Sequence, residues 1–171
     1  MTRNVSVREA VEDDAADLLA LRHVLLGETE YMLWGPGEFD GSVQDERQQI
    51  RQLNACPNAR CLVATDDNAL VGFLHAMGSP VVRLRHATTL ALGVRRSHWG
   101  HGAGSALLAE ALAWSRSAGL VRVELTVHTT NVRAVALYLR HGFEIEGTRR
   151  KSLQIGDRYV DEYLMCRTND F

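Results

Sequence analysis

Residues 94–138 read VRRSHWGHGAGSALLAEALAWSRSAGLVRVELTVHTTNVRAVALY and follow a short apolar run with β-branched members, Thr88–Val94. Such a run, bounded by turn signals, is typical of a buried strand. Apolar residues then recur at helical spacing over 106–118, and Gly119 stands where a helix end favours glycine. The sequence therefore predicts a strand, a glycine-rich connection, a helix and a further strand over 120–127.

The connection contains three alternating glycines, Gly100, Gly102 and Gly104. Glycine lets the backbone turn tightly and approach a ligand, and the first turn of a helix leaves N–H groups free at the positive end of the helix dipole. We expect this connection to hold a phosphate; an ordinary glycine-rich turn is the alternative. It does not match a dinucleotide fingerprint, because Ser105 and Leu107 stand where glycine or a small residue is needed. It also lacks the lysine and hydroxyl residue of a Walker loop.

A second motif follows the glycines. It has the spacing N-x-x-A-x-x-L-Y-x-x-x-G-F and is made of Asn131, Ala134, Leu137, Tyr138, Gly142 and Phe143. Together the two motifs resemble the GCN5-related N-acetyltransferase (GNAT) superfamily, and the resemblance covers nearly the whole chain. It implies a mixed α/β fold, with a largely antiparallel sheet, helices on both faces, and fourth and fifth strands that splay apart to admit acyl-CoA. The segments 142–148 and 159–165 look most like the bacterial branch that acylates amino acids, polyamines or ribosomal protein N-termini.

The resemblance implies an acetyl-CoA site along the fourth strand, the glycine loop and the last helix. Its expected residues are Leu92, Val94, Trp99, Gly100, His101, Gly102, Ala103, Gly104, Ser105, Asn131, Ala134 and Tyr138. The superfamily loop usually opens with glutamine or arginine where this chain has Trp99. Backbone donors remain there, and Arg95, Arg96 and His101 are the candidate sources of positive charge.

Tyr138 is the residue that the resemblance assigns to the leaving thiolate. It stands seven residues after Asn131, so both lie on one helix face. A phenol with a pKa of about 10 is a modest acid for a thiolate. The alternative is an aromatic side chain that only packs on the sheet.

The general base is less defined, because the fourth strand has no acid at Thr88, Thr89 or Leu90. The candidates are carboxylates and histidines that each also fit a structural role, or an ordered water relay. These residues are Glu28, Glu30, His75, His86 and His128. We select Glu30 as catalytic, and Glu28, Tyr31 and His86 as substrate-binding.

The N-terminal half predicts the remaining elements. A strand around Val5 and Val7 precedes a helix capped by Asp13 or Asp14 that ends near Gly27, and Ser42 with Asp45 starts a second helix. Two strands, Arg60–Thr65 and Leu70–Met77, form a hairpin, and the next strand begins near His86. The irregular segment 27–41 carries carboxylates and aromatic residues and is either a substrate lip or a loop that plugs the core.

Composition favours one domain over residues 1–171, since 46% of the chain is hydrophobic and 23% is charged. A net charge of −2 disfavours nucleic acid as the partner. The absence of an apolar run of about 18 residues disfavours a membrane, and with no signal peptide we expect a cytoplasmic protein.

The three cysteines, Cys56, Cys61 and Cys166, lack metal or redox spacing, so we expect reduced thiols that serve as small buried apolar residues; an acyl-accepting nucleophile is the alternative. His98 and His101 lack a third ligand, so we expect no metal.

We therefore predict an acetyl-CoA-dependent N-acetyltransferase that acts on a primary amine of a small molecule, such as an amino acid or polyamine. Transfer is expected to be direct, because no cysteine has an activating neighbour in sequence. A homodimer is a further expectation. The alternatives are an acetyltransferase for protein N-termini, a CoA-binding module without turnover, and, third, a nicotinamide oxidoreductase.

Overall fold

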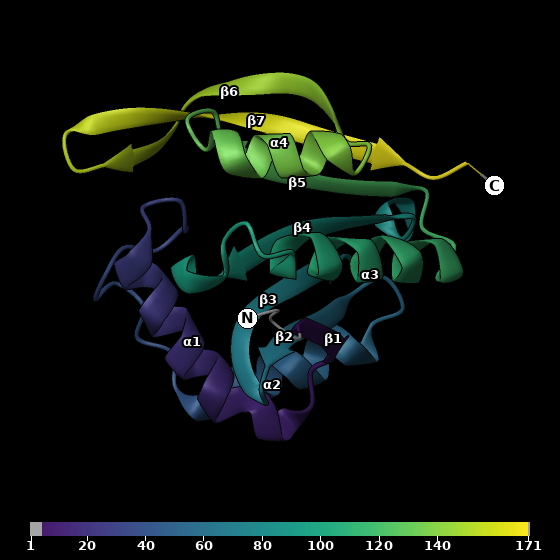
Figure 1. The fold of residues 1–171 in the computed structure, drawn as a ribbon. Coiled ribbons are helices and arrows are strands. Elements are labelled where there is room, and N and C mark those ends of the chain that lie inside the picture. Colours follow the sequence, from purple (N-terminus) through teal and green to yellow (C-terminus); the bar gives the residue numbers. More distant parts are fainter. Residues whose placement is uncertain (1–4, 171) are drawn as a thin grey trace.

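The computed structural model describes residues 5–170, which form a seven-stranded sheet with helices on both faces (Figure 1). The elements in chain order are β1 (Val5–Glu9), the 3-10 turn η1 (Glu12–Asp14), α1 (Ala15–Glu28), α2 (Val43–Ala55), β2 (Arg60–Asp66), β3 (Ala69–Gly78), η2 (Val82–Leu84), β4 (Ala87–Val94), η3 (Arg96–His98), α3 (Ala103–Ser117), β5 (Arg122–His128), α4 (Val132–Arg140), β6 (Glu144–Ile155) and β7 (Arg158–Thr168). This order agrees with the strands and helices predicted for the N-terminal half and for residues 88–127.

The strand order in the sheet is β1-β2-β3-β4-β5-β7-β6, and every neighbouring pair except one is antiparallel. The exception is β4 with β5, which are parallel and pair only over Ala87–Thr89 and Arg122–Glu124. The remainder of β4 stays paired with β3, and the remainder of β5 with β7. The two strands therefore separate after Thr89, as expected, and we call the opening between them the β4–β5 gap.

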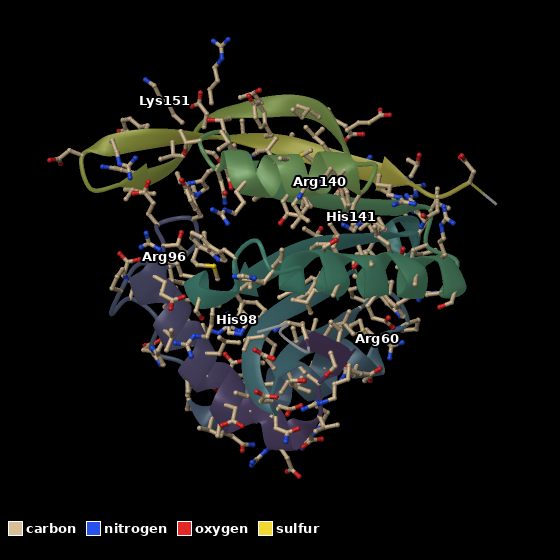
Figure 2. The ribbon with its side chains drawn as sticks, in the orientation of Figure 1. Arg60, Arg96, His98, Arg140, His141 and Lys151 are labelled. Carbon is tan, nitrogen blue, oxygen red and sulfur yellow. The ribbon has the colours of Figure 1, made fainter. Side chains whose placement is uncertain are left out.

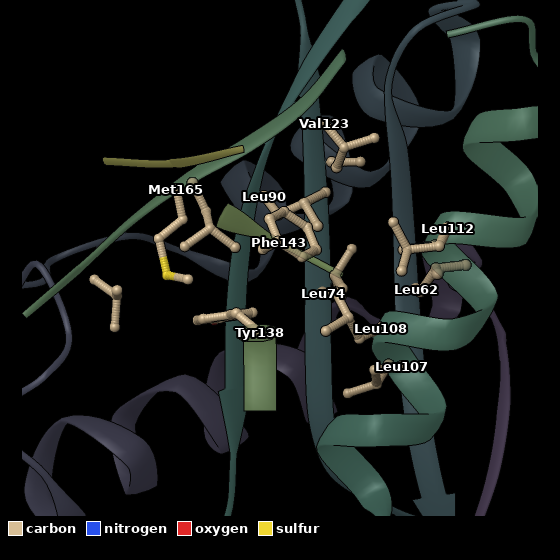
Figure 3. Packing of buried hydrophobic residues seen from close by; sticks show 14 of the residues in the cluster. Leu62, Leu74, Leu90, Leu107, Leu108, Leu112, Val123, Tyr138, Phe143 and Met165 are labelled. Carbon is tan, nitrogen blue, oxygen red and sulfur yellow. The ribbon is translucent and has the colours of Figure 1, made fainter. Parts of the chain in front are cut away.

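Successive side chains of a strand point to opposite faces of the sheet, so they form two hydrophobic clusters, one with each layer of helices. On one face Leu62 and Leu74 pack with α3 residues such as Leu108, and Figure 3 shows Tyr138 and Phe143 in the same cluster. On the other face the neighbouring residues of β2 and β3 pack against α1 and α2; they include Cys61, Val63 and Phe73. The sheet therefore has two faces, which we call the α3–α4 face and the α1–α2 face, and the gap lies between them.

Local signals account for several element boundaries. Ser42 caps α2 by accepting from the Asp45 N–H at 3.2 Å, and Asp45 accepts from the Ser42 N–H at 2.8 Å. The hairpin turns at Asp67 and Asn68, which both have positive φ. Asp14 behaves differently from the expected cap, because its carboxylate accepts from the Val11 N–H and pairs with Arg8 instead of capping α1.

The helix expected over 106–118 starts earlier, at Ala103, because its N-cap is Gly102 in the left-handed region with φ +90°. Within residues 5–170, we find no helix with the length and apolar content that a bilayer crossing requires.

Candidate functional site

The glycine loop between β4 and α3 exposes backbone donors. Gly100 and Gly102 have φ of +76° and +90°, which a residue with a side chain rarely adopts. No side chain caps α3, and the first intrahelical acceptor, the Gly102 carbonyl, takes the N–H of Ala106. The N–H groups of the first turn, 103–105, therefore point out of the helix without helical acceptors, at the positive end of its dipole.

Gly104 and Ser105 join the start of α3 to α4. A Cβ atom on Gly104 would lie 3.3 Å from a methyl group of Leu137, so glycine permits the close approach of the two helices. The Ser105 hydroxyl lies 2.8 Å from His141 Nε2. Burial lowers the pKa of His141, with smaller effects from Arg140 and Arg167, which favours a neutral ring in this bond. For Ser105, the backbone N–H is the group that remains for a phosphate.

Two acids hold the loop from outside. Glu28, at the end of α1, accepts from the Arg96 N–H at 2.7 Å and lies 3.9 Å from the Arg95 guanidinium. Asp66, in the β2–β3 hairpin, lies 3.1 Å from His98 Nε2. Glu28 was expected to bind substrate, but its contacts are with the loop. It therefore positions the loop through the backbone N–H of Arg96.

Trp99 fills the position at which a polar side chain was expected. Its indole N–H donates to the Val94 carbonyl at 2.7 Å, which closes the loop onto the end of β4. Two guanidinium groups lie over its ring, that of Arg133 at 5.0 Å and that of Arg96 at 5.9 Å from the centroid. Figure 2 shows Arg96 and His98 near the loop end of α3.

The free edge of β4 lies beside this loop. The Arg95 N–H donates to Val71 of β3, so by strand alternation the backbone groups of Val94 and Leu92 face the gap. The Val94 carbonyl is taken by Trp99, whereas the N–H and C=O of Leu92 face the opening, where β5 is not paired. They can hydrogen-bond an extended ligand with amide groups.

Across the gap, α4 begins at Asn131. The side chain of Asn131 is the N-cap, because its amide oxygen accepts from the Ala134 N–H at 3.2 Å. The structure thus gives Asn131 and Ala134 a local role in starting α4. In Figure 1 both α3 and α4 begin at the end of the molecule where the glycine loop lies.

Tyr138 lies in the hydrophobic cluster on the α3–α4 face. It is 7% exposed, and its ring centroid lies 5.7 Å from that of Phe143. Burial raises the pKa of Tyr138 to about 12. Within residues 5–170 no side chain forms a hydrogen bond with the Tyr138 hydroxyl. The phenol is therefore protonated at neutral pH and available as a donor.

Polar side chains gather on the other face, at the far end of β5. The rings of Tyr31 and His128 meet edge to face with centroids 5.5 Å apart, and Glu30 pairs with Arg158 of β7. His128 is opposite Glu162 in the β5–β7 register and is 4% exposed. Burial lowers the pKa of His128, whereas Glu162 and Glu30 act in the opposite direction. A neutral imidazole at the mouth of the gap can accept a proton.

Two other candidate bases are placed differently. His86 precedes β4 at its paired end, where its carbonyl accepts from Val121 and Arg122. The structure does not bring His86 to the gap, so its selection as a substrate-binding residue is corrected. His75 lies in the core with 3% exposure, and burial lowers its pKa to about 3. It is a neutral core residue rather than an accessible base.

Two of the three cysteines are buried, as expected, whereas Cys56 is exposed, contrary to the expected burial. Cys61 is fully buried, and burial raises the pKa of its thiol to about 12. Cys166 is buried, and its pKa is raised by the same cause. Within residues 5–170 no group of three His, Cys, Asp or Glu side chains has metal-binding geometry. His98 is engaged by Asp66 instead of by His101.

Two hollows lie away from the glycine loop. One of about 170 Å³ adjoins the closed end of the gap and is lined by residues that include Thr89, Glu124 and Thr126. The other, of about 680 Å³, lies at the C-terminal ends of α3 and α4 and is lined by charges of both signs, among them Arg140 and Glu144. Neither contains the glycine loop.

Comparison with known proteins identifies the family. The sequence profile described as "Acetyltransferase (GNAT) family" matches residues 27–143. The chain is 35% identical over 115 residues to the L-amino acid N-acetyltransferase AaaT of Escherichia coli, covering 65% of this chain and 69% of that protein.

Two solved structures have the same fold. A GNAT-family acetyltransferase from Streptococcus pneumoniae matches with a TM-score of 0.92 and 30% identity, covering 96% of this chain and 99% of that one. A ribosomal-protein-alanine N-acetyltransferase from Brucella melitensis matches with a TM-score of 0.85 and 25% identity at the same coverage. The chain is therefore an acetyltransferase of α/β fold, and it belongs to the GNAT family.

Sequence reasoning missed Arg133 and the grouping of Tyr31 with His128. Arg133 follows Asn131 by two residues, so its position in the first turn of α4 could be predicted from the sequence. Its contact with Trp99 was not, because these residues come from separate elements.

Proposed function

We propose that the protein is an acetyl-CoA-dependent N-acetyltransferase for the primary amine of a small molecule, with amino acids as the preferred class. The glycine loop, with its unfilled N–H groups and positive helix end, supports binding of the diphosphate. The open edge of β4 at Leu92 supports binding of the amide-containing arm in the gap. The similarity to an L-amino acid N-acetyltransferase supports the acceptor class.

In the proposed reaction the group that acts on the leaving sulfur and the group that accepts the amine proton lie on opposite faces of the sheet. The amine nitrogen attacks the thioester carbonyl, the C–S bond breaks, and the amide product and a thiolate form. On the α3–α4 face, Tyr138 donates a proton or hydrogen bond to the departing sulfur. On the α1–α2 face, His128 accepts the proton that the amine loses. Glu28 and Glu30 have other roles in this proposal, because Glu28 accepts from the loop backbone and Glu30 pairs with Arg158.

One observation carries the choice of amino acids, the pair formed by Arg158 and Glu30 at the mouth of the gap. Both side chains are about half exposed, 54% and 49%, so an incoming ligand can exchange with either partner. A guanidinium binds a carboxylate through paired hydrogen bonds, and a carboxylate binds an ammonium group. The pair therefore complements a zwitterion better than it complements a polyamine, which has no carboxylate.

The test is a thiol-release assay of the purified protein with acetyl-CoA and a panel of L-amino acids, polyamines and peptides with free N-termini. We expect turnover with amino acids, and a rise in KM of about tenfold or more in Arg158→Gln from the loss of a charge-assisted contact. Arg150→Gln, an exposed arginine on β6, is the matched control. Turnover only with peptides would favour a protein N-terminal acetyltransferase; the Brucella melitensis structure is named as a ribosomal-protein-alanine N-acetyltransferase. Binding of acetyl-CoA without turnover on any amine would favour a CoA-binding module.

The same proposal includes a single domain over 1–171 that acts without a metal. The expected homodimer stays a prediction, which sedimentation of the purified protein tests.

A further inference from the structure

The Trp99 ring, Arg96 and Arg133 form a group that we call the cation platform. The Arg133 guanidinium lies 5.0 Å from the ring centroid and that of Arg96 lies 5.9 Å away, so one indole carries two positive charges. Arg133 is exposed on the first turn of α4, and Arg96 is exposed beside the loop. Cation–π attraction accounts for the stacking of each group, but the two charges repel one another.

No carboxylate within residues 5–170 pairs with the side chains of Arg133 or Arg96. The contrast is Arg95, whose guanidinium lies 3.9 Å from Glu28. Eight arginines within residues 5–170 have a carboxylate partner, for example Arg158 with Glu30. The platform is thus a concentration of charge without its counter-charge, which is what an anion would complete.

The platform also lies against the glycine loop. A Cβ atom on Gly100 would lie 4.0 Å from Arg133 Nη1, so this guanidinium is adjacent to the backbone that presents the N–H donors. Trp99 is itself fixed, because its N–H donates to Val94 at 2.7 Å. Stacking on this fixed ring therefore restricts the conformations of the long Arg133 side chain.

We propose that Arg133, positioned by the Trp99 ring, binds the diphosphate of CoA. It would supply the side-chain donor that the loop lacks at position 99. The inference rests on the proposed acetyl-CoA site. Arg133 is assigned to the diphosphate rather than to the 3′-phosphate because it adjoins Gly100 in the loop that receives the diphosphate. Trp99 is a positioning residue and makes no contact with the ligand in this assignment.

The test is calorimetric binding of acetyl-CoA, acetyl-dephospho-CoA and acetyl-pantetheine to the whole chain. Arg133→Gln keeps a polar side chain but is shorter and lacks the charge, and its Kd for acetyl-CoA should rise about tenfold to a hundredfold. The rise should be equal for acetyl-dephospho-CoA and absent for acetyl-pantetheine, which has no phosphate. Arg140→Gln, an exposed arginine at the other end of α4, is the control and should leave the three values unchanged.

The role of Trp99 is tested by a double-mutant cycle. Trp99→Phe keeps an aromatic face but lacks the N–H, and Trp99→Leu lacks the face. Replacing Arg133 by Gln should cost much less affinity in the Trp99→Leu background than in wild type, with coupling partly retained in Trp99→Phe. Melting temperatures of all variants check that the fold is kept.

The outcomes separate two failures. If wild-type protein does not bind acetyl-CoA, both the proposed function and this inference fail. If wild type binds but Arg133→Gln binds equally well, only the inference fails. A loss confined to acetyl-CoA, with acetyl-dephospho-CoA unaffected, would assign Arg133 to the 3′-phosphate and overturn the diphosphate assignment.

Discussion

Replacement of Tyr138 by phenylalanine isolates the hydroxyl that we assign to the leaving thiolate. The ring and its contact with Phe143, at 5.7 Å between centroids, are kept. Within residues 5–170 the hydroxyl has no side-chain hydrogen bond to lose. We therefore expect the free energy of unfolding to change by less than about 1 kcal/mol. Any effect on turnover then reports on chemistry.

The size of that effect follows from the pKa of Tyr138, which burial raises to about 12. A thiol has a pKa of about 8.5, so full transfer of the proton from Tyr138 to a settled thiolate is uphill by about 3 to 4 pKa units. Tyr138 therefore acts mainly as a hydrogen-bond donor to the developing negative charge on sulfur. A charge-assisted hydrogen bond contributes about 1.5 to 3 kcal/mol, so kcat should fall by a factor of about 10 to 150.

The assay is thiol release at saturating acetyl-CoA, with Kd and melting temperature measured on the same preparation. Tyr159→Phe, at an exposed position on β7, is the matched control and should behave as wild type. Unchanged kcat in Tyr138→Phe would remove Tyr138 from the reaction. A joint loss of affinity and melting temperature would instead identify it as a packing residue.

The remaining predictions concern the loop, the cysteines and pH. Gly104→Val should weaken acetyl-CoA binding by about tenfold or more by forcing Leu137 away from α3, whereas Gly102→Val acts through its positive φ, at a cost of about 1 to 2 kcal/mol in stability. Unchanged calorimetric affinity in both folded variants would contradict phosphate binding by the glycine loop. Replacing all three cysteines by alanine should preserve most turnover, since the Cys61 thiol has a pKa of about 12; an acetylated cysteine trapped by mass spectrometry would overturn direct transfer. Burial lowers the pKa of His75 to about 3. Below pH ~6.5 the unfolded chain binds a proton at this histidine that the native state does not bind, so the free energy of unfolding decreases as pH falls. Between pH ~6.5 and pH ~4 wild type should lose roughly 3 kcal/mol that His75→Leu does not lose, as measured by urea unfolding; parallel pH profiles would refute this assignment.

Local signals in the sequence were enough to predict most of the elements and the glycine loop. Ser42 and Asp45 form the expected capping box, because both partners lie within one helical turn. The glycines predicted a strand–loop–helix connection because the φ angles of Gly100 and Gly102 depend on local sterics. These features need only a few neighbouring residues.

The site needed contacts between distant residues, which no local pattern encodes. Glu28 holds the loop across a separation of 68 residues, and Glu30 pairs with Arg158 across 128. His86 was misplaced because the end of β4 at which the strands separate depends on where β5 pairs. Arg133 reaches Trp99 only after α4 packs beside the loop.

The central claim is that acetyl-CoA lies on the glycine loop and in the β4–β5 gap. The most direct measurement is the amide NMR spectrum of the protein titrated with a non-hydrolysable acetyl-CoA analogue. We predict the largest shifts in the amides of residues 100–105 and Leu92, with those of α2 unchanged. Shifts that leave the loop unaffected and gather around the hollow between Arg140 and Glu144 would contradict the account.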